Sequence, residues 1–469
     1  MRVTLRMSSR FLGDRRGNIA VIFALTMVPT IYLLGMALDY TQALRKQGQL
    51  NAAADAAAIA AVRPAMLMQT DDVAQSTATA IFGSTANSLP GLSSVPTPTV
   101  TITNSGLQRT VTVSYSARSI NNFPSLLGSQ SWPIGGSSTA QASSAPNMNF
   151  YLLLDDSPSM AIGATQTDIN TLKKYTAGQP SGSCGFACHE VNPSLDPGAS
   201  WATNDNLSIA RTNKVNLRID LVVNAVKQLL VGPWSCPQNG VTGGVMQCMS
   251  ALNNTSYKAG LYTFDYDLNE LQSLASLSTV AGQIRNIQLL TVDHQNCVTT
   301  SNCNTDYGTD IEGALTDLND IMPNPGLGSN QTGDTPQEVV FLVTDGVEDK
   351  IISSSSGCNK DALVQKVSNT KYRCQQPLDT AICDTIKTKK GIRIAILYTE
   401  YLQLNGDNWY DTHVAQFNNP SSSTGKIAQQ LQSCASPGLF ADVQTGGDIS
   451  AALTDLFIKV ASSTASLTH

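Results

Sequence analysis

Five oxygen-bearing side chains lie next to predicted strands and helices in a way that would bring them to one edge of a sheet. They are Asp155, Ser157, Ser159, Thr309 and Asp345. The first three follow the apolar run 150–154, the fourth precedes a predicted helix at residues 311–321, and the last follows the apolar run 339–343. Because ligands of a doubly wound sheet bind at the carboxyl ends of its strands, we expect these side chains to share one crevice.

Two carboxylates and three hydroxyls, without an imidazole or a thiolate, form a hard-oxygen set that favours Mg²⁺, Mn²⁺ or Ca²⁺ over Zn²⁺. Mg²⁺ prefers near-octahedral oxygen coordination, so a position left to water can accept a carboxylate from another protein. The predicted chemistry is therefore recognition and not catalysis. The pattern Asp-x-Ser-x-Ser alone is usually an ordinary turn, so the prediction depends on the combination of all three loops.

Other sequence features give little support for an enzyme. The chain has four histidines, none of them in a recognisable catalytic motif: His189, His294, His413 and His469. The sequence lacks both the Gly-x4-Gly-Lys-Ser/Thr phosphate loop and the Gly-x-Ser-x-Gly elbow. A metal-assisted hydrolase stays as an alternative. The segment Cys184-Gly-Phe-Ala-Cys188-His189 approaches a c-type haem attachment, but it has three spacer residues instead of two, which favours a local disulfide.

From residue 149 onward, predicted strands alternate with predicted helices, a pattern typical of a parallel sheet covered on both faces. Strands are predicted at residues 150–154, 258–264, 338–344, 393–398 and 439–443. Helices are predicted at residues 207–230, 280–289, 311–321, 426–434 and 449–461. The predicted fold class is therefore α/β, with a doubly wound parallel sheet and a long insertion at residues 161–203.

An uncharged apolar segment at residues 18–38 is long enough, as a helix, to cross the roughly 30 Å of a bilayer's hydrocarbon core. The preceding residues 1–17 carry five arginines and one aspartate, and such an excess is held on the cytoplasmic side. We therefore predict one transmembrane helix at residues 18–40, with the rest of the chain outside the cytoplasm. A cleaved secretory signal, with Ala43 near the cut, is the alternative, and it would export the same residues.

Residues 41–145 are predicted to form a small helix-plus-sheet unit. The alanine-rich stretch 41–62 would extend the membrane helix, and its small-residue face could receive a partner helix or pack against its own domain. A second helix is predicted at residues 71–84, before prolines interrupt the chain. Strands are predicted at residues 100–103, 107–117 and 137–142, the first two as a hairpin.

The composition favours an exported protein without a nucleic-acid partner. Charged residues make up 14% of the chain, whereas about 25% is typical. The net charge is -6, and no basic cluster beyond the N-terminal segment could neutralise a run of phosphates. All ten cysteines follow the apolar segment, and their even number indicates an oxidising compartment. We predict two local disulfides, Cys236 with Cys248 and Cys297 with Cys303.

These loops resemble those of von Willebrand factor A domains that carry a metal-ion-dependent adhesion site. The matching residues occur in the family's order: Asp155, Ser157 and Ser159 in the first loop, Thr309 in the second and Asp345 in the third. The resemblance implies that residues 147–463 form such a domain and bind a divalent cation through these side chains. The sequence departs from the family at Pro158, where many members carry glycine, and in the insertion 161–203.

The N-terminal region resembles the TadG-type proteins of bacterial Flp (tight-adherence) pilus assembly. The resemblance rests on Arg16-Gly17-Asn18, on Asp39-Tyr40 and on the alanine-rich residues 49–58. Members join such an anchor to a von Willebrand A domain. This implies a bacterial inner-membrane protein whose periplasmic part recognises other pilus-assembly components. A surface-exposed adhesin that binds a host or matrix protein is the alternative. Prepilin-like relatives carry Glu five residues after the cleaved glycine, whereas Ile22 stands there, so we expect the anchor to be retained.

Overall fold

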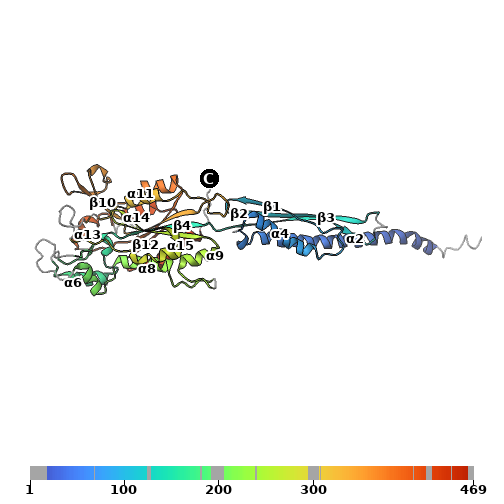
Figure 1. Ribbon diagram of the computed structural model, residues 1–469, viewed down its shortest axis with the longest axis horizontal. Helices are drawn as coiled ribbons and strands as arrows, with labels where there is room; N and C mark the ends of the chain where they lie inside the picture. The colour runs from blue at the N-terminus through green and yellow to red at the C-terminus, as the bar shows by residue number, and fades with distance from the viewer. Residues whose placement is uncertain are drawn as a thin grey trace, which may run out of the picture. The chain divides into compact units, whose positions relative to one another are not determined.

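The computed structural model describes residues 18–67, 69–123, 128–179, 182–191, 205–237, 240–293, 306, 308–404, 406–418, 425–444 and 446–462. The chain forms two compact units, Met1–Ser144 and Ala145–His469, which we call unit 1 and unit 2. Figure 1 follows the elements of both units along the chain.

Unit 1 begins with one long helix, α2 Asn18–Ala61. The large apolar side chains in its first part, residues 19–38, are exposed. By length and composition this part could cross a membrane, and it is compatible with the predicted single-pass anchor. Pro29 lies inside the helix without ending it.

The second part of α2 packs against the rest of unit 1. Leu50, Ala54 and Ala57 are fully buried, and they form one apolar cluster with α4 Asp71–Ala86 and the sheet of unit 1. The short helix α3 Pro64–Leu67 lies between the two long helices in the chain. The small-residue face therefore packs within its own unit, which is one of the two arrangements considered from the sequence, and α4 confirms the second predicted helix.

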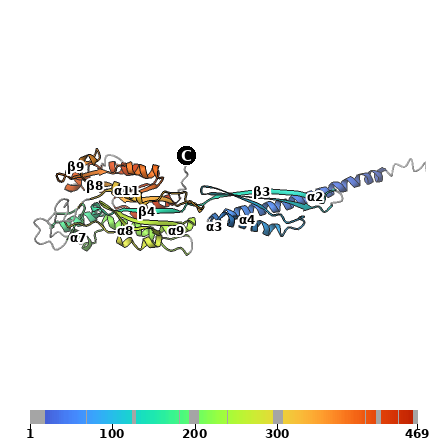
Figure 2. The ribbon, with the colours of Figure 1, turned by 45° about the horizontal axis from the view of Figure 1, so that its top comes forward.

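The sheet of unit 1 is antiparallel in the order β1-β2-β3. Its strands are β1 Thr99–Ser105, β2 Gln108–Ile120 and β3 Ser131–Ser143. The first two form the predicted hairpin around Gly106 and Leu107, and the third strand is longer than expected. Alternate residues of β2, including Val111 and Val113, are buried toward the helices, and Figure 2 shows α2 and α4 running along the strands.

Unit 2 is built on a six-stranded sheet in the order β12-β11-β7-β4-β5-β6. Its strands are β4 Met148–Asp155, β5 Tyr257–Phe264, β6 Leu268–Ser276, β7 Gln337–Thr344, β11 Arg393–Thr399 and β12 Phe440–Val443. All pairs are parallel except β5 with β6. The five predicted strands are confirmed, and β6 is an unpredicted edge strand.

Helices cover both faces of this sheet (Figure 1). Phe150 and Leu152 of β4 face one core, and Tyr151 and Leu153 face the other. The first core is covered by α8 Arg218–Leu230, α9 Val245–Asn253, α10 Leu277–Ala281 and α15 Ile449–Ser462. The second is covered by α11 Ile311–Ile321 and α14 Gly425–Cys434. The α/β class with a doubly wound sheet is therefore confirmed.

Two helix predictions were wrong in detail. The predicted helix 207–230 is divided into α7 Asn206–Thr212 and α8, because Lys214 between them has a φ of 54°. The predicted helix 280–289 ends early, since Gly282 caps α10 and only the short 3-10 turn η4 Ile284–Asn286 follows. Shorter segments complete the unit: η2 Pro158–Ala161, α6 Gln166–Thr176, η5 Ser355–Gly357, α12 Ala381–Asp384, the π-helical η6 Thr385–Lys389 and α13 Asn408–His413.

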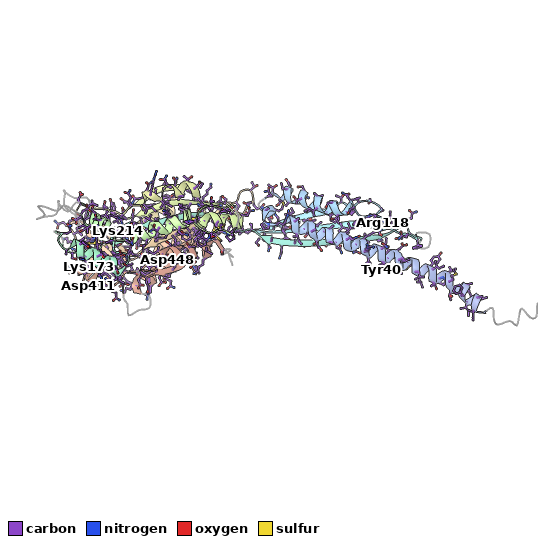
Figure 3. The ribbon with its side chains drawn as sticks, turned by 90° about the horizontal axis from the view of Figure 1, so that it is seen from below. Tyr40, Arg118, Lys173, Lys214, Asp411 and Asp448 are labelled. Carbon is purple, nitrogen blue, oxygen red and sulfur yellow. A yellow bond between two sulfur atoms is a disulfide. The ribbon has the colours of Figure 1, made fainter. Side chains whose placement is uncertain are left out.

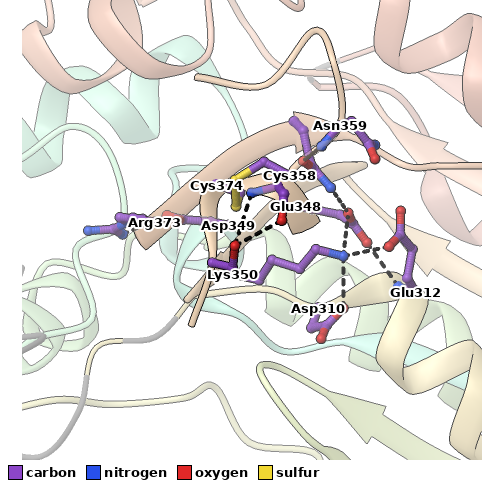
Figure 4. Close-up of a disulfide and its surroundings, with 12 residues drawn as sticks. Asp310, Glu312, Glu348, Asp349, Lys350, Cys358, Asn359, Arg373 and Cys374 are labelled. Carbon is purple, nitrogen blue, oxygen red and sulfur yellow. Dashed lines mark hydrogen bonds and ion pairs between the residues drawn. A yellow bond between two sulfur atoms is a disulfide. The ribbon is translucent and has the colours of Figure 1, made fainter. Parts of the chain in front are cut away.

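A second, unpredicted sheet follows β7. It has the antiparallel order β8-β10-β9, with β8 Val347–Ile352, β9 Leu363–Lys366 and β10 Tyr372–Pro377. The disulfide Cys358–Cys374 closes this insert sheet (Figure 4). The predicted disulfides Cys184–Cys188 and Cys236–Cys248 are confirmed, and Cys383–Cys434 is a further one. The predicted pair Cys297–Cys303 lies outside the described residues.

Candidate metal centre

The first polar loop begins at the carboxyl end of β4. Asp155 is the last residue of this strand and is fully buried. Its Oδ1 accepts the Ser157 N–H at 3.1 Å, and its Oδ2 accepts the hydroxyl of Thr344 at 2.6 Å. Since β4 pairs with β7 on one side and with β5 on the other, the loop lies where the order of the strands reverses. This is the position at which a doubly wound sheet binds its ligands.

The second carboxylate, Asp345, directly follows β7 and is also fully buried. Its Oδ2 lies 3.4 Å from Nη1 of Arg218, a buried residue at the start of α8. Nη2 of Arg218 donates to the Glu400 carbonyl at 2.8 Å, and the guanidinium lies 4.7 Å from the centre of the Tyr401 ring. The carboxyl group of Asp345 interacts with Ser159, Tyr401 and the Val347 backbone, yet its buried Oδ1 has no hydrogen-bond partner among the described residues.

The electrostatics of the two carboxylates suit a cation. Burial, together with the charge of Asp345, raises the pKa of Asp155 to about 7. Burial likewise raises the pKa of Asp345, although Arg218 acts in the opposite direction. A divalent cation would stabilise the ionised form of both carboxyl groups and would give the unpaired Oδ1 of Asp345 a partner. The residues present therefore fit a hard cation.

Two of the three predicted hydroxyls, Ser157 and Ser159, interact with this carboxylate pair. Oγ of Ser157 is 3.2 Å from Oγ of Ser159, and Ser159 interacts with the carboxyl group of Asp345. Thr309 is held by two backbone hydrogen bonds to Asp349 of β8, of 3.0 and 2.8 Å. The structure thus connects the four residues of the first and third loops through direct interactions. Thr309 joins them by lining the same pocket as Ser159.

This pocket has a volume of about 120 Å³, and three aromatic rings line it: Phe186, Tyr401 and Trp409. Phe186 stacks on Tyr401 with ring centres 6.0 Å apart. Arg373 of β10 lies over the Trp409 ring at 4.8 Å and binds both oxygens of Asp349 at 2.6 Å. The pocket therefore combines apolar walls with a guanidinium that is already neutralised by a carboxylate.

Neither the aromatic walls nor Arg218 and Arg373 were identified from the sequence. Phe186 lies inside the loop closed by Cys184–Cys188, and that small disulfide loop is the one signal that could have indicated a built wall. Pro158, the departure from the family pattern, takes the first position of η2. The chain needs no backbone N–H there, so the proline fits the loop.

Comparisons with known proteins found one family model and several solved structures that are similar to this chain. Residues 17–69 match the family model described as "Putative Flp pilus-assembly TadE/G-like". The solved structure of BatB from Bacteroides thetaiotaomicron is 12% identical, with 68% of this chain and 100% of that chain covered and a TM-score of 0.28. The vWF domain of the type V pili tip protein Mfa5 from Porphyromonas gingivalis is 11% identical, with 68% and 96% covered and a TM-score of 0.31.

The pilus adhesin SpaC from Lactobacillus rhamnosus GG is 14% identical, with 78% of this chain and 33% of that chain covered and a TM-score of 0.32. A comparison with curated proteins found no match. The family match confirms the resemblance seen around residues 16–18 and 49–58. Unit 2 has the doubly wound sheet with the polar loops at its point of strand reversal. The chain therefore has an N-terminal segment that matches the TadE/G-like family model, followed by a unit with a doubly wound α/β sheet.

Proposed function

We propose that this chain is a periplasmic protein anchored in the bacterial inner membrane, and that unit 2 recognises other components of Flp pilus assembly through a bound divalent cation. The unpaired, buried Oδ1 of Asp345 beside Asp155 is the observation that carries the proposal. Mg²⁺, or Mn²⁺ or Ca²⁺ in its place, would be held by Asp155, Ser157, Ser159, Thr309 and Asp345. The ion would leave a residual positive charge to attract a partner's carboxylate.

The pocket next to this site supports protein recognition better than hydrolysis. His189 is the imidazole that lines it. Nδ1 of His189 lies 3.1 Å from the Leu290 carbonyl, and Nε2 lies 3.7 Å from Oδ2 of Asp306. Both ring nitrogens therefore face other groups, so His189 is not placed to act as a base toward Ser159 or Thr309. The aromatic walls instead offer contact area for the side chains that flank a donated carboxylate.

The proposed location is supported by the apolar start of α2, by the arginine excess before it and by the disulfides of unit 2. Disulfides persist in oxidising compartments such as the periplasm. Cell fractionation tests the location against the adhesin alternative. We expect the chain in the inner-membrane fraction, and exposure on the outer surface would favour an adhesin.

Metal binding is tested on the full chain in detergent micelles. Mg²⁺ or Mn²⁺ should raise the melting temperature, because a ligand selective for the native state adds RT ln(1 + [L]/Kd) to its stability. Asp155→Ala should abolish this gain. Asp334→Ala is a matched control, because its carboxylate accepts hydrogen bonds from Leu327, Ser329 and Thr335 in the segment before β7, at the opposite edge of the sheet. This control variant should have a lower melting temperature than the wild type, but Mg²⁺ or Mn²⁺ should raise that temperature by the same amount. An equal gain in the Asp155→Ala chain would contradict the proposed site.

Partner recognition is tested by recovering the tagged chain from solubilised membranes and identifying what remains bound. EDTA should release pilus-assembly components from the wild-type chain and from the Asp334→Ala chain. Asp155→Ala should recover little of them before EDTA is added. Partners that stay bound after elemental analysis confirms metal removal would refute metal-dependent recognition and would leave the fold unaffected.

A further inference from the structure

One end of unit 1 carries exposed aromatic and apolar side chains and an arginine, together with the half-buried Trp132. We call this set the proximal face, and its members are Tyr40, Arg118, Ile120, Phe123 and Trp132. Tyr40, Ile120 and Phe123 are 47%, 45% and 38% exposed. The rings of Tyr40 and Trp132 meet edge to face with centres 5.7 Å apart. Figure 3 labels Tyr40 and Arg118 at the end of unit 1 from which α2 continues alone.

Asp39 fixes the position along the axis of α2 at which the proximal face lies. Its carboxylate is almost fully buried and accepts the N–H groups of Asn122 and Phe123 at 2.7 and 3.0 Å. The end of β2 is therefore held beside residue 39 of the helix. The strand pairing of Ser119 with Trp132 then brings the start of β3 to nearly the same level.

The apolar part of α2 places that level relative to a bilayer. Residues 19–38 rise by about 1.5 Å each and so span the roughly 30 Å of a hydrocarbon core. Residue 39 then lies where the helix enters the headgroup layer, which adds roughly 5–8 Å on each side. Tyrosine and tryptophan are enriched in this layer, and an arginine there is attracted to lipid phosphates.

We infer that the proximal face docks on the lipid headgroups of the bilayer that α2 crosses, so that unit 1 rests on the membrane surface. The inference rests on the proposed membrane anchor. It explains how Asp39 is tolerated at the edge of the hydrocarbon core, because two backbone donors replace water around its charge. It also accounts for the exposure of Ile120 and Phe123 at this end of unit 1.

The test uses the full chain in vesicles of brominated phosphatidylcholine mixed with phosphatidylglycerol, with tryptophan emission as the readout. Bromines near the headgroup end of the acyl chains should quench the tryptophan emission of the wild-type protein more than bromines near the bilayer centre. Trp132→Phe, which keeps an aromatic ring beside Tyr40, should lose this quenching. Adding Leu107→Trp to that variant places a tryptophan at the opposite end of the 13-residue strand β2, roughly 40 Å away, and should not restore it.

The controls separate this inference from the anchor itself. A chain that does not float with the vesicles overturns the anchor and the inference together. A chain that floats while Trp132→Phe and the wild type are quenched equally overturns the inference alone, as expected if a protein partner covers this face instead. Ile120→Asp combined with Phe123→Asp should reduce the quenching without lowering the melting temperature, because both side chains are exposed. Unchanged quenching in that variant would also overturn the inference.

Discussion

Two of the groups of buried charge in unit 2 differ in whether their oxygens have partners. In the candidate metal centre, Asp345 lies beside the guanidinium of Arg218, Asp155 accepts hydrogen bonds from Ser157 and Thr344, and Oδ1 of Asp345 has no hydrogen-bond partner among the described residues. In the second group, Nζ of Lys350 lies 2.5 Å from Glu312, 3.3 Å from Glu348 and 3.7 Å from Asp310 (Figure 4). Glu348 also accepts hydrogen bonds from the Glu312 N–H and from Gln376, each at 2.9 Å.

The ion pairs around Lys350 help to position the backbone beside the candidate metal centre. Burial lowers the pKa of Lys350, but the surrounding carboxylates more than offset this, so the pKa is raised and the side chain stays charged. Lys350 thereby ties β8 to the start of α11, and the backbone of the neighbouring Asp349 pairs with Thr309. In the group around Lys350 every charge has partners, so this group positions the chain. The pair of Asp155 and Asp345 leaves one oxygen unpaired, so this pair is suited to a ligand.

The largest expected effect comes from breaking the satisfied group. Lys350→Met leaves Glu348 fully buried without its counter-charge, so the free energy of unfolding should fall by about 3 kcal/mol. Urea unfolding in EDTA measures this loss apart from any contribution of a bound metal ion. Lys366→Met, on the exposed edge strand β9, should change stability by no more than about 0.5 kcal/mol. A loss from Lys350→Met below about 1 kcal/mol would show that this group contributes no more than a surface ion pair.

A smaller and two-sided effect is expected at the metal centre. Arg218→Gln removes the guanidinium beside Asp345, so in EDTA the stability should fall by about 2 kcal/mol. The same change removes a positive charge that competes with the cation, so Mg²⁺ should bind more tightly and raise the melting temperature by more than in the wild type. Calorimetric titration with Mg²⁺ measures the affinity directly. Arg211→Gln, in a partly exposed pair with Asp220, should alter neither quantity. Weaker Mg²⁺ binding by Arg218→Gln would contradict the proposed competition.

Most of the fold follows from patterns that are local in the sequence. Strands buried on both faces, such as β4 and β7, give continuous apolar runs that are easily placed. Helix ends were less predictable because single residues decide them. Val280, Ile284 and Ile287 have helical spacing and are all buried, yet the chain leaves the α-helix at Gly282.

The candidate site was predictable only where its residues follow strands. Asp155 and Asp345 could be paired because two parallel strands end side by side. Arg218 precedes Asp345 by 127 residues, Arg373 lies in strand β10 of the insert sheet, and Trp409 lies in the short helix α13. Tertiary packing alone brings these three side chains to the site, so no local signal marks them.

The smallest expected effect is a difference in pH dependence between two carboxylates. Asp334 has several hydrogen-bond donors, and Asp155 belongs to the candidate metal centre. Hydrogen bonds from Ser329, Leu327 and Thr335 outweigh desolvation and lower the pKa of Asp334 below 3.8. Its contribution, at most about 1 kcal/mol because water screens it, is therefore present above 3.8 and lost as the pH falls. The pKa of Asp155 is raised to about 7, so without metal its effect has the opposite sign: stability is greatest below 3.8 and falls as the pH rises toward 7. In EDTA, the stability of Asp334→Asn should approach that of the wild type at low pH. The stability of Asp155→Asn relative to the wild type should instead be highest at high pH. Urea unfolding over a pH range that includes 3.8 and 7 measures both differences, and slopes of the same sign would show that the two carboxylates do not differ in the way their partners indicate.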